Sequence, residues 1–307
     1  DSDDTRILGG TQDNGSPYFR YNTTGNHSAS YDVSSGDGSF AYMGKNYFLT
    51  SSQRGRAIRY NYNSTGDPTN WSYVSPSEAN GQLFIHPFAV DPTNENYVAY
   101  PSGNHIFLNK EMTTIARNTS GENMNGWTRL RHVSVGSGQN ITALSFSKKN
   151  PSSRLYLGGS SDSKKPTILR MDNMKDDSTF TVTTIDGANE GSYIHDIHVN
   201  PENGDEILVV LSNYEVESLF HSSNGGSTWN AVGGNLEGEN GPSFRAAAIA
   251  PTDGGGSYYY AGTSIGLYMT DELNGGETVW IPTGLQTMGA PIIADLDCRE
   301  SDDLLVA

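Results

Sequence analysis

The sequence is short of cysteine, of basic side chains and of long apolar runs. It has one cysteine, Cys298, among 307 residues, so no disulfide can form within the chain. Its 19 lysine and arginine residues stand against 35 aspartate and glutamate residues, which gives a formal net charge of −16. Nucleic acids and anionic membranes attract basic faces, so this balance disfavours both as partners. No apolar stretch approaches the roughly 18 residues that a membrane-spanning helix needs, so we expect no membrane insertion.

Sequence motifs of catalysis and of metal binding are missing as well. The chain contains no HExxH, no GxSxG nucleophile elbow, no P-loop and no GxGxxG in a βαβ setting. His195 and His198 are spaced so that their side chains would lie on opposite faces of a strand, where they cannot bind one ion together. We therefore expect no metal and no cofactor. Apolar positions at helical spacing are also absent over any long stretch, which argues against a helical fold.

What the chain does contain is a repeat of about fifty residues. Short strands rich in tyrosine, valine and isoleucine alternate with clusters of glycine, asparagine, aspartate and serine. A bulky aromatic residue recurs at this period, and so does a proline that closes an apolar run. The aromatic series is Trp71, Trp127, Phe180, Trp229 and Trp280, and the proline series is Pro92, Pro151, Pro201 and Pro251.

Each repeat can be drawn as four strands in a constant order. An apolar strand ends at the proline, two more follow across polar turns, and the fourth begins near the aromatic residue. Four antiparallel strands in a unit of about fifty residues are typical of a β-propeller blade. We therefore predict an all-β fold, a single β-propeller domain over residues 1–307, with the first strand of each blade innermost. The five complete blades are expected at about 36–76, 84–135, 141–185, 194–234 and 243–285, with a partial blade at each end.

The strands expected at the two ends of the chain do not together form one complete blade. The chain opens on a hairpin, residues 5–21, with no strand before it, and closes inside an apolar run, residues 304–307. A blade cut in this way leaves strand edges unpaired, which propellers avoid by closing their ring. We therefore expect these residues to be part of a longer chain that carries further blades and other domains.

One turn carries a recognisable motif. It reads SSNGGSTW and matches the pattern S-x-D-x-G-x-T-W, with asparagine in place of aspartate. The serine and asparagine side chains are expected to bond the backbone of the turn, a glycine to take a positive φ, and the tryptophan to pack beneath. A degenerate copy precedes Trp280. The structural set is Ser222, Asn224, Gly226, Thr228 and Trp229.

This motif resembles that of the Asp-box (BNR-repeat) β-propeller superfamily, which includes sialidases, xyloglucan-cleaving hydrolases and sortilin-type receptors. With GGTQDNGS near the start and SNYEVESLFHSSNGGSTW later, the whole chain is similar to large surface propellers exported by Bacteroidota. The resemblance implies a propeller in an extracellular or cell-surface location in a bacterium. It does not imply an activity, because such folds host many functions.

A set of polar side chains recurs at one position of the repeat. Counting back six residues from the proline of a blade reaches a polar side chain that apolar residues follow. If the first strands line the channel, these side chains form a ring at one mouth that can bind a ligand. The alternative is that they line a water-filled channel. The set is His86, Ser145, His195 and Arg245, with Asp37 at the corresponding place in the first blade.

A glycoside hydrolase needs two carboxyl groups separated by roughly 5 to 9.5 Å across the sugar. Asp13 and Asp37 are the acidic residues in a motif-like setting near a predicted mouth, so they are the candidates for acid and base. Asp13 lies in QDNG, however, where it can equally cap a hairpin turn. A sialidase would need an arginine cluster, and its N-terminal arginine motif is absent. Tyr193 and Tyr214 could stack on sugar rings, or simply pack.

These observations favour a non-catalytic extracellular module for adhesion, scaffolding or recognition, which binds a protein or a glycan. The alternative is a glycoside hydrolase of the xyloglucanase-like kind that uses Asp13 and Asp37. The SSNGGSTW turn matches its structural motif closely, whereas Asp13 and Asp37 are weakly supported as a catalytic pair. We therefore place the recognition module before the hydrolase. A carboxyl separation well above about 10 Å, or burial of Asp13 in its own turn, would exclude the hydrolase.

Overall fold

The computed structural model describes residues 5–21, 30–63, 66–172, 174, 179–299 and 304–307. Regular structure in these residues is almost entirely β, with one short α-helix, α1 (Leu285–Met288), and four three-residue 3-10 helices, η1 (Gln53–Gly55), η2 (Met112–Thr114), η3 (Gly234–Leu236) and η4 (Gly275–Glu277). Contacts divide the chain into two compact units, which we call unit 1 (Asp1–Val133) and unit 2 (Ser134–Ala307). None of the helices in the described residues is long and apolar enough to cross a membrane.

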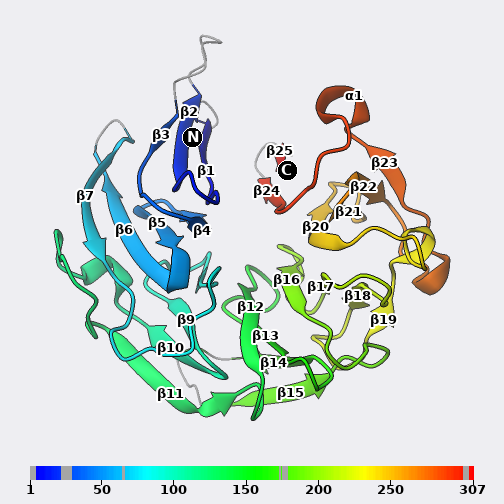
Figure 1. The fold of residues 1–307 in the computed structure, drawn as a ribbon, viewed down its shortest axis with the longest axis horizontal. Coiled ribbons are helices and arrows are strands. Elements are labelled where there is room, and N and C mark those ends of the chain that lie inside the picture. The colour runs from blue at the N-terminus through cyan, green and yellow to red at the C-terminus, as the bar shows by residue number, and fades with distance from the viewer. Residues whose placement is uncertain (1–4, 22–29, 64–65, 173, 175–178, 300–303) are drawn as a thin grey trace. The chain divides into compact units, whose positions relative to one another are not determined.

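Unit 1 contains one three-stranded sheet and two four-stranded blades, all antiparallel (Figure 1). The strands of each sheet follow one another along the chain. The small sheet is β1 (Thr5–Leu8), β2 (Pro17–Tyr21) and β3 (Tyr31–Asp32). The first blade is β4 (Gly38–Met43), β5 (Tyr47–Ser52), β6 (Arg56–Tyr62) and β7 (Pro68–Tyr73), and the second is β8 (Ala89–Val90), β9 (Val98–Ser102), β10 (His105–Asn109) and β11 (Trp127–Ser134).

Unit 2 contains three four-stranded blades and one two-stranded sheet, also antiparallel. The blades are β12 (Asn140–Phe146), β13 (Leu155–Ser160), β14 (Thr167–Met171) and β15 (Phe180–Thr184); β16 (Ile194–Val199), β17 (Ile207–Leu211), β18 (Leu219–Ser222) and β19 (Asn230–Ala231); and β20 (Phe244–Pro251), β21 (Ser257–Thr263), β22 (Gly266–Thr270) and β23 (Ile281–Thr283). The last sheet is β24 (Asp297–Arg299) and β25 (Leu304–Val306). The predicted all-β fold with five four-stranded propeller blades is confirmed.

The first strands of the blades in unit 2 lie next to one another. β12 contacts β16, β16 contacts β20, and β20 contacts β24 (Figure 1). In the first two blades of unit 2 the second strand, β13 or β17, is buried along its whole length. A strand covered on both faces reads as a continuous apolar run, as ILVVL does here. The first strand is thus the inner strand of its blade in unit 2, as predicted.

The recurring tryptophans connect one blade to the blade before it. In unit 1 the indole Nε1–H of Trp127 donates to the carbonyl of Val74 at 2.8 Å. In unit 2 the Nε1–H of Trp280 donates to the carbonyl of Val232 at the same distance, 2.8 Å. Each acceptor lies just beyond the last strand of the preceding blade. Trp127 and Trp280 thus connect neighbouring blades through a buried hydrogen bond, whereas the buried Nε1 of Trp229 has no hydrogen-bond partner in the described part of the chain.

The inner strands carry an irregularity that the sequence pattern did not reveal. In four of the five blades a β-bulge interrupts the pairing of the first and second strands near the start of the first. A bulge inserts one extra residue and redirects its side chain. The extra residues in unit 2 are Thr142 in β12, His195 in β16 and Arg245 in β20.

Candidate ligand site on unit 2

His195 and Arg245 are the bulged residues of two neighbouring inner strands, β16 and β20. Both side chains are half-buried. Burial, and after it the positive charge of Arg245, lower the pKa of His195. Both effects disfavour the charged imidazolium, so the ring is neutral at pH 7. The structure thus brings together two of the side chains that the sequence placed at one mouth.

Two exposed tyrosines complete this group. The ring of Tyr193 lies 6.4 Å from that of His195, centroid to centroid. Tyr214, on the loop between β17 and β18, is 57% exposed. Hydrogen bonds to Ser264 and to Arg245 lower the pKa of its hydroxyl. We call Tyr193, His195, Tyr214 and Arg245 the His195 cluster.

A pair of carboxyl groups on the inner strands of unit 2 has strongly altered acidity. Asp196 follows the bulge of β16, and its Oδ2 accepts a hydrogen bond from the backbone N–H of Ala247 at 3.1 Å. Burial, with a further contribution from the charge of Asp295, raises the pKa of Asp196 to about 7. Burial also raises the pKa of Asp295 to about 6, although its side chain keeps contact with solvent. Such carboxyls can hold or release a proton near neutral pH, which is what acid and base catalysis requires.

Asp196 and Asp295 were not recognised in the sequence. They are distant along the chain and come together because the inner strand β16 and the segment before β24 belong to the same unit. The available signal was an aspartate next to isoleucine, alanine or leucine, in IHDIHV of β16 and in IADLDC leading into β24. A buried aspartate without a basic partner is costly, so such a position deserved note.

The structure places His86 in the core of unit 1. It is 1% exposed and packs against Tyr100, with ring centroids 4.7 Å apart and the ring planes tilted by 55°. Its Nδ1 accepts a hydrogen bond from the N–H of Leu83 at 3.2 Å, and its Nε2 lies 3.1 Å from the carbonyl of Pro101. Burial lowers its pKa to about 4, so the ring is neutral and Nε2–H is the donor to the carbonyl. These contacts give His86 a structural role, in contrast to the ligand contact expected from the sequence.

Ser145 lies away from the bulge of its strand. It pairs with Tyr156 in the second half of β12, whereas the bulged residue is Thr142. Counting back from Pro151 reaches Ser145 because the segment between β12 and this proline is longer than in the next two blades. The hydroxyl of Thr142 is buried and donates to the carbonyl of Ile194 at 2.7 Å. The equivalent of His195 in this blade is therefore used to join two blades.

Asp13 and Asp37 are brought together in unit 1. The backbone N–H of Asp13 donates to Oδ1 of Asp37 at 3.0 Å. Asp13 takes a positive φ of 64° in the turn that follows β1, and its side chain is exposed. The N–H of Asp37 in turn donates to Oε1 of Gln53 at 3.0 Å. Asp37 therefore caps the turn that presents Asp13, and the Asp13 carboxylate points to solvent.

The SSNGGSTW turn is closed by its own side chains. Ser222 Oγ accepts a hydrogen bond from the N–H of Gly226 at 2.9 Å. Asn224 Oδ1 accepts from the N–H of Thr228 at 2.9 Å, and its Nδ2 donates to the hydroxyl of Thr228 at 2.8 Å. Gly226 has a φ of 79°, and a side chain there would meet the ring of Trp229. The five residues of this set thus stabilise the hairpin that leads into β19.

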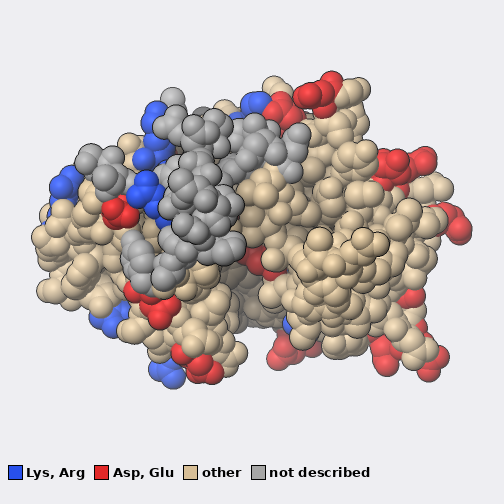
Figure 2. All heavy atoms as spheres, turned by 90° about the horizontal axis from the view of Figure 1, so that it is seen from above, with Lys and Arg blue, Asp and Glu red and all other residues tan. Residues whose placement is uncertain are grey.

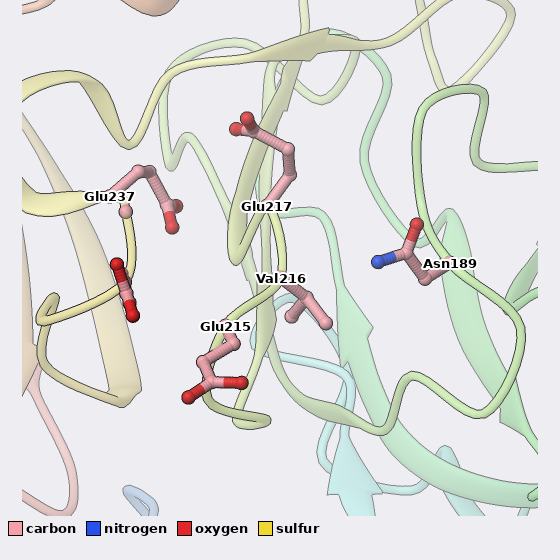
Figure 3. Close-up of a pocket in the computed structure, with 7 residues that line it drawn as sticks. Asn189, Glu215, Val216, Glu217 and Glu237 are labelled. Carbon is pink, nitrogen blue, oxygen red and sulfur yellow. The ribbon is translucent and has the colours of Figure 1, made fainter.

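Unit 2 also contains an acidic pocket of about 380 Å³. Glu215 and Glu217 extend from one loop on either side of Val216, and Glu237 faces them from the segment after β19 (Figure 3). Burial, with the charge of Glu217 as a lesser cause, raises the pKa of Glu237 to about 7. Among the residues that the structure describes, no group of three or more histidine, cysteine, aspartate or glutamate side chains is arranged to hold a metal ion.

Comparison with known proteins gives a fold and no closer assignment. No family model matches the chain, and no curated protein matches it. Among solved structures, a GH74 enzyme of Niastella koreensis superposes with a TM-score of 0.51 and 16% sequence identity. The match covers 80% of this chain and 36% of the enzyme, so the chain spans little more than a third of that protein. This similarity and the five blades place the chain among the β-propeller proteins.

Proposed function

We propose that this protein is a non-catalytic extracellular recognition module that binds a glycan through the His195 cluster. The observation that carries the proposal is the convergence of Tyr193, His195, Tyr214 and Arg245 from three segments of unit 2. Aromatic faces beside fixed polar groups are the usual means of holding a saccharide. The exposed ring of Tyr214 supplies the face, and the neutral imidazole and the guanidinium supply hydrogen bonds.

The charge of unit 2 favours a neutral glycan over an acidic one. Residues 134–307 contain 23 of the 35 acidic side chains and 9 of the 19 basic ones. Figure 2 shows that, on the face drawn, acidic side chains stand in separate groups over the surface. Their summed field repels a polyanion. Arg245 keeps its positive charge while it bonds to Tyr214, but this single charge does not offset the excess of acidic side chains.

Origin and location follow from the turn motif and remain part of the proposal. The bonding of the SSNGGSTW turn supports an Asp-box (BNR-repeat) propeller, of the sortilin-like and xyloglucanase-like kind. We propose an extracellular or cell-surface location in a bacterium, where such a module serves adhesion or scaffolding. A protein ligand at the same cluster is the competing outcome, and a glycan array distinguishes the two.

The test is a glycan array followed by titration of the best neutral oligosaccharide. Tyr214→Ala should weaken binding about tenfold, since loss of one aromatic face is worth roughly 1.4 kcal/mol. Tyr258→Ala is the matched control, because Tyr258 is also exposed and lies on β21 of unit 2, outside the His195 cluster. Equal affinity of both variants and the parent protein would exclude the His195 cluster as the binding site.

A glycoside hydrolase is the second candidate, and the carboxyl pair Asp196 and Asp295 favours it. The likeness to a GH74 enzyme supports the same alternative. A hydrolysis screen on xyloglucan and on other plant and algal polysaccharides tests it by release of reducing ends. Activity lost in Asp295→Asn would identify the pair Asp196 and Asp295, and activity lost in Asp13→Asn would identify the pair in unit 1. The absence of released sugar leaves recognition as the function.

A further inference from the structure

We propose that unit 1 contains a second saccharide site, independent of the His195 cluster, in a groove where a neutral pyranose stacks on Trp71. The groove has a volume of about 580 Å³. Residues of β6 and β7 line one side, and the turns at one end of the small sheet line the other. All of these residues belong to unit 1.

The floor of the groove is an aromatic surface on one face of β6 and β7. Tyr60 pairs with Trp71 across the two strands, and Ile58 pairs with Tyr73. Because side chains alternate along a strand, these four lie on the same face. The rings of Trp71 and Tyr73 are 5.2 Å apart at 68°, so they form a corner and not a flat shelf. Trp71 is the more exposed ring of this corner, and Tyr73 packs against it edge to face.

The opposite side of the groove is polar. It is formed by Asp13 and Asn14 from one turn, by Asp32 at the end of β3, and by Ser34 and Ser35 from the segment that follows β3. Both carboxylates are exposed, so they can accept hydrogen bonds from a ligand. A pyranose has an apolar C–H face and a rim of hydroxyl donors, which match an aromatic floor and a carboxylate wall.

Trp71 departs from the other members of its series. Trp127, Trp229 and Trp280 are 7%, 8% and 2% exposed, whereas Trp71 is 41% exposed. Trp127 and Trp280 connect neighbouring blades through Nε1, and Trp71 instead lines the groove. An exposed tryptophan lacks the stability that burial of its ring would give. Trp71 is the fourth residue of β7, whereas the other three lie at or just before the start of their outer strands, so Trp71 occupies a different place in its blade and its ring is available to a ligand.

The charges around the groove are mixed, since the carboxylates of Asp13 and Asp32 line one side and a guanidinium covers one ring on the other. The guanidinium of Arg56 lies over the ring of Tyr73, 3.9 Å from its centroid. This cation occupies one face of the tyrosine and repels a second positive charge. The face that remains for a ligand is that of Trp71, which favours an uncharged ring.

The first experiment is titration of the whole chain with neutral hexasaccharides, read by tryptophan fluorescence. The probes are the hexaoses of β-1,4-glucan, β-1,3-glucan, β-1,4-mannan and α-1,4-glucan. Because the other three tryptophans are buried, a saturable change in emission reports on Trp71. We expect it with at least one probe. A flat response to all four probes, or a response to tetramethylammonium of equal size, would overturn the proposal.

Variants measured by calorimetry then locate the site. Trp71→Ala should weaken binding of the positive probe at least tenfold, and Trp71→Phe should weaken it less. Phe84→Ala is the matched control, because Phe84 is an exposed aromatic of unit 1 that does not line the groove. Tyr214→Ala separates the two sites, since it should leave this binding unchanged. Loss of binding in Tyr214→Ala with full binding in Trp71→Ala would overturn the groove and support the His195 cluster alone.

Discussion

Replacement of Asp196 by asparagine should remove a pH dependence from the folding stability of this protein. In the folded state the pKa of Asp196 is raised from 3.8 to about 7. The folded protein therefore holds a proton that the unfolded chain loses above about pH 4, so stability falls as pH rises from about 4 to about 7. One pKa unit corresponds to about 1.4 kcal/mol, so the loss is about 4 kcal/mol at most. It is an upper bound because part of the shift comes from the charge of Asp295, which itself titrates.

The asparagine variant keeps an oxygen acceptor for the N–H of Ala247 and carries no charge at any pH. Above pH 7 it should be more stable than the parent protein by up to about 4 kcal/mol, and at pH 4 the two should be alike. Urea unfolding at pH 4.5, 6, 7 and 8 measures the difference. Asp253→Asn, on an exposed turn, is the control for loss of one charge. Parallel pH profiles for Asp196→Asn and the parent protein would refute the burial argument.

Three further substitutions test contacts within the blades, each by urea unfolding. Trp280→Phe should lower the free energy of unfolding by about 1 kcal/mol, because the buried carbonyl of Val232 loses its donor; no change would mean that the indole bond is replaced by water. Asn224→Ala should cost about 1–2 kcal/mol, since its side chain closes the SSNGGSTW turn with two hydrogen bonds. Arg154→Met should cost about 1 kcal/mol, because it removes the guanidinium 2.5 Å from Asp172 while Arg170 still pairs with that carboxylate at 3.1 Å; an unchanged free energy of unfolding would show that Arg170 alone is sufficient for Asp172.

The blades could be predicted from the sequence because each strand leaves a local mark. Runs such as ILVVL in β17 show burial on both faces, and glycine-rich turns separate them at regular intervals. The bulges left no such mark. A bulge depends on how two strands pair, and the residues around Thr142, His195 and Arg245 have no sequence feature in common. Counting from the proline works where the turn length is constant and fails at Ser145, where the turn is longer.

Part of the candidate site could also be predicted from the repeat. His195 and Arg245 could be found because they occupy one register position of neighbouring repeats. The same reasoning selected His86, whose strand β8 is short and begins after it, so its ring turns into the core. The pairing of Asp196 with Asp295 depends on contact between distant segments, which a periodic pattern cannot report.

In a repeat of this kind, comparison of equivalent positions distinguishes residues that are needed for folding from residues that are available for binding. Every blade needs its inner strand paired, its turns closed and its outer strand packed, and equivalent residues meet those needs in the same way. Where a residue of one blade differs from its equivalents in the other blades and the blade still folds, that side chain is not needed for the fold. The hydroxyl of Thr142 joins two blades, whereas His195 and Arg245 at the same bulge do not repeat that contact and instead meet exposed tyrosines. Trp71 departs from its series in the same sense, and it lines a groove. The departures from the repeat, more than the repeat itself, are therefore where binding by this propeller should be sought.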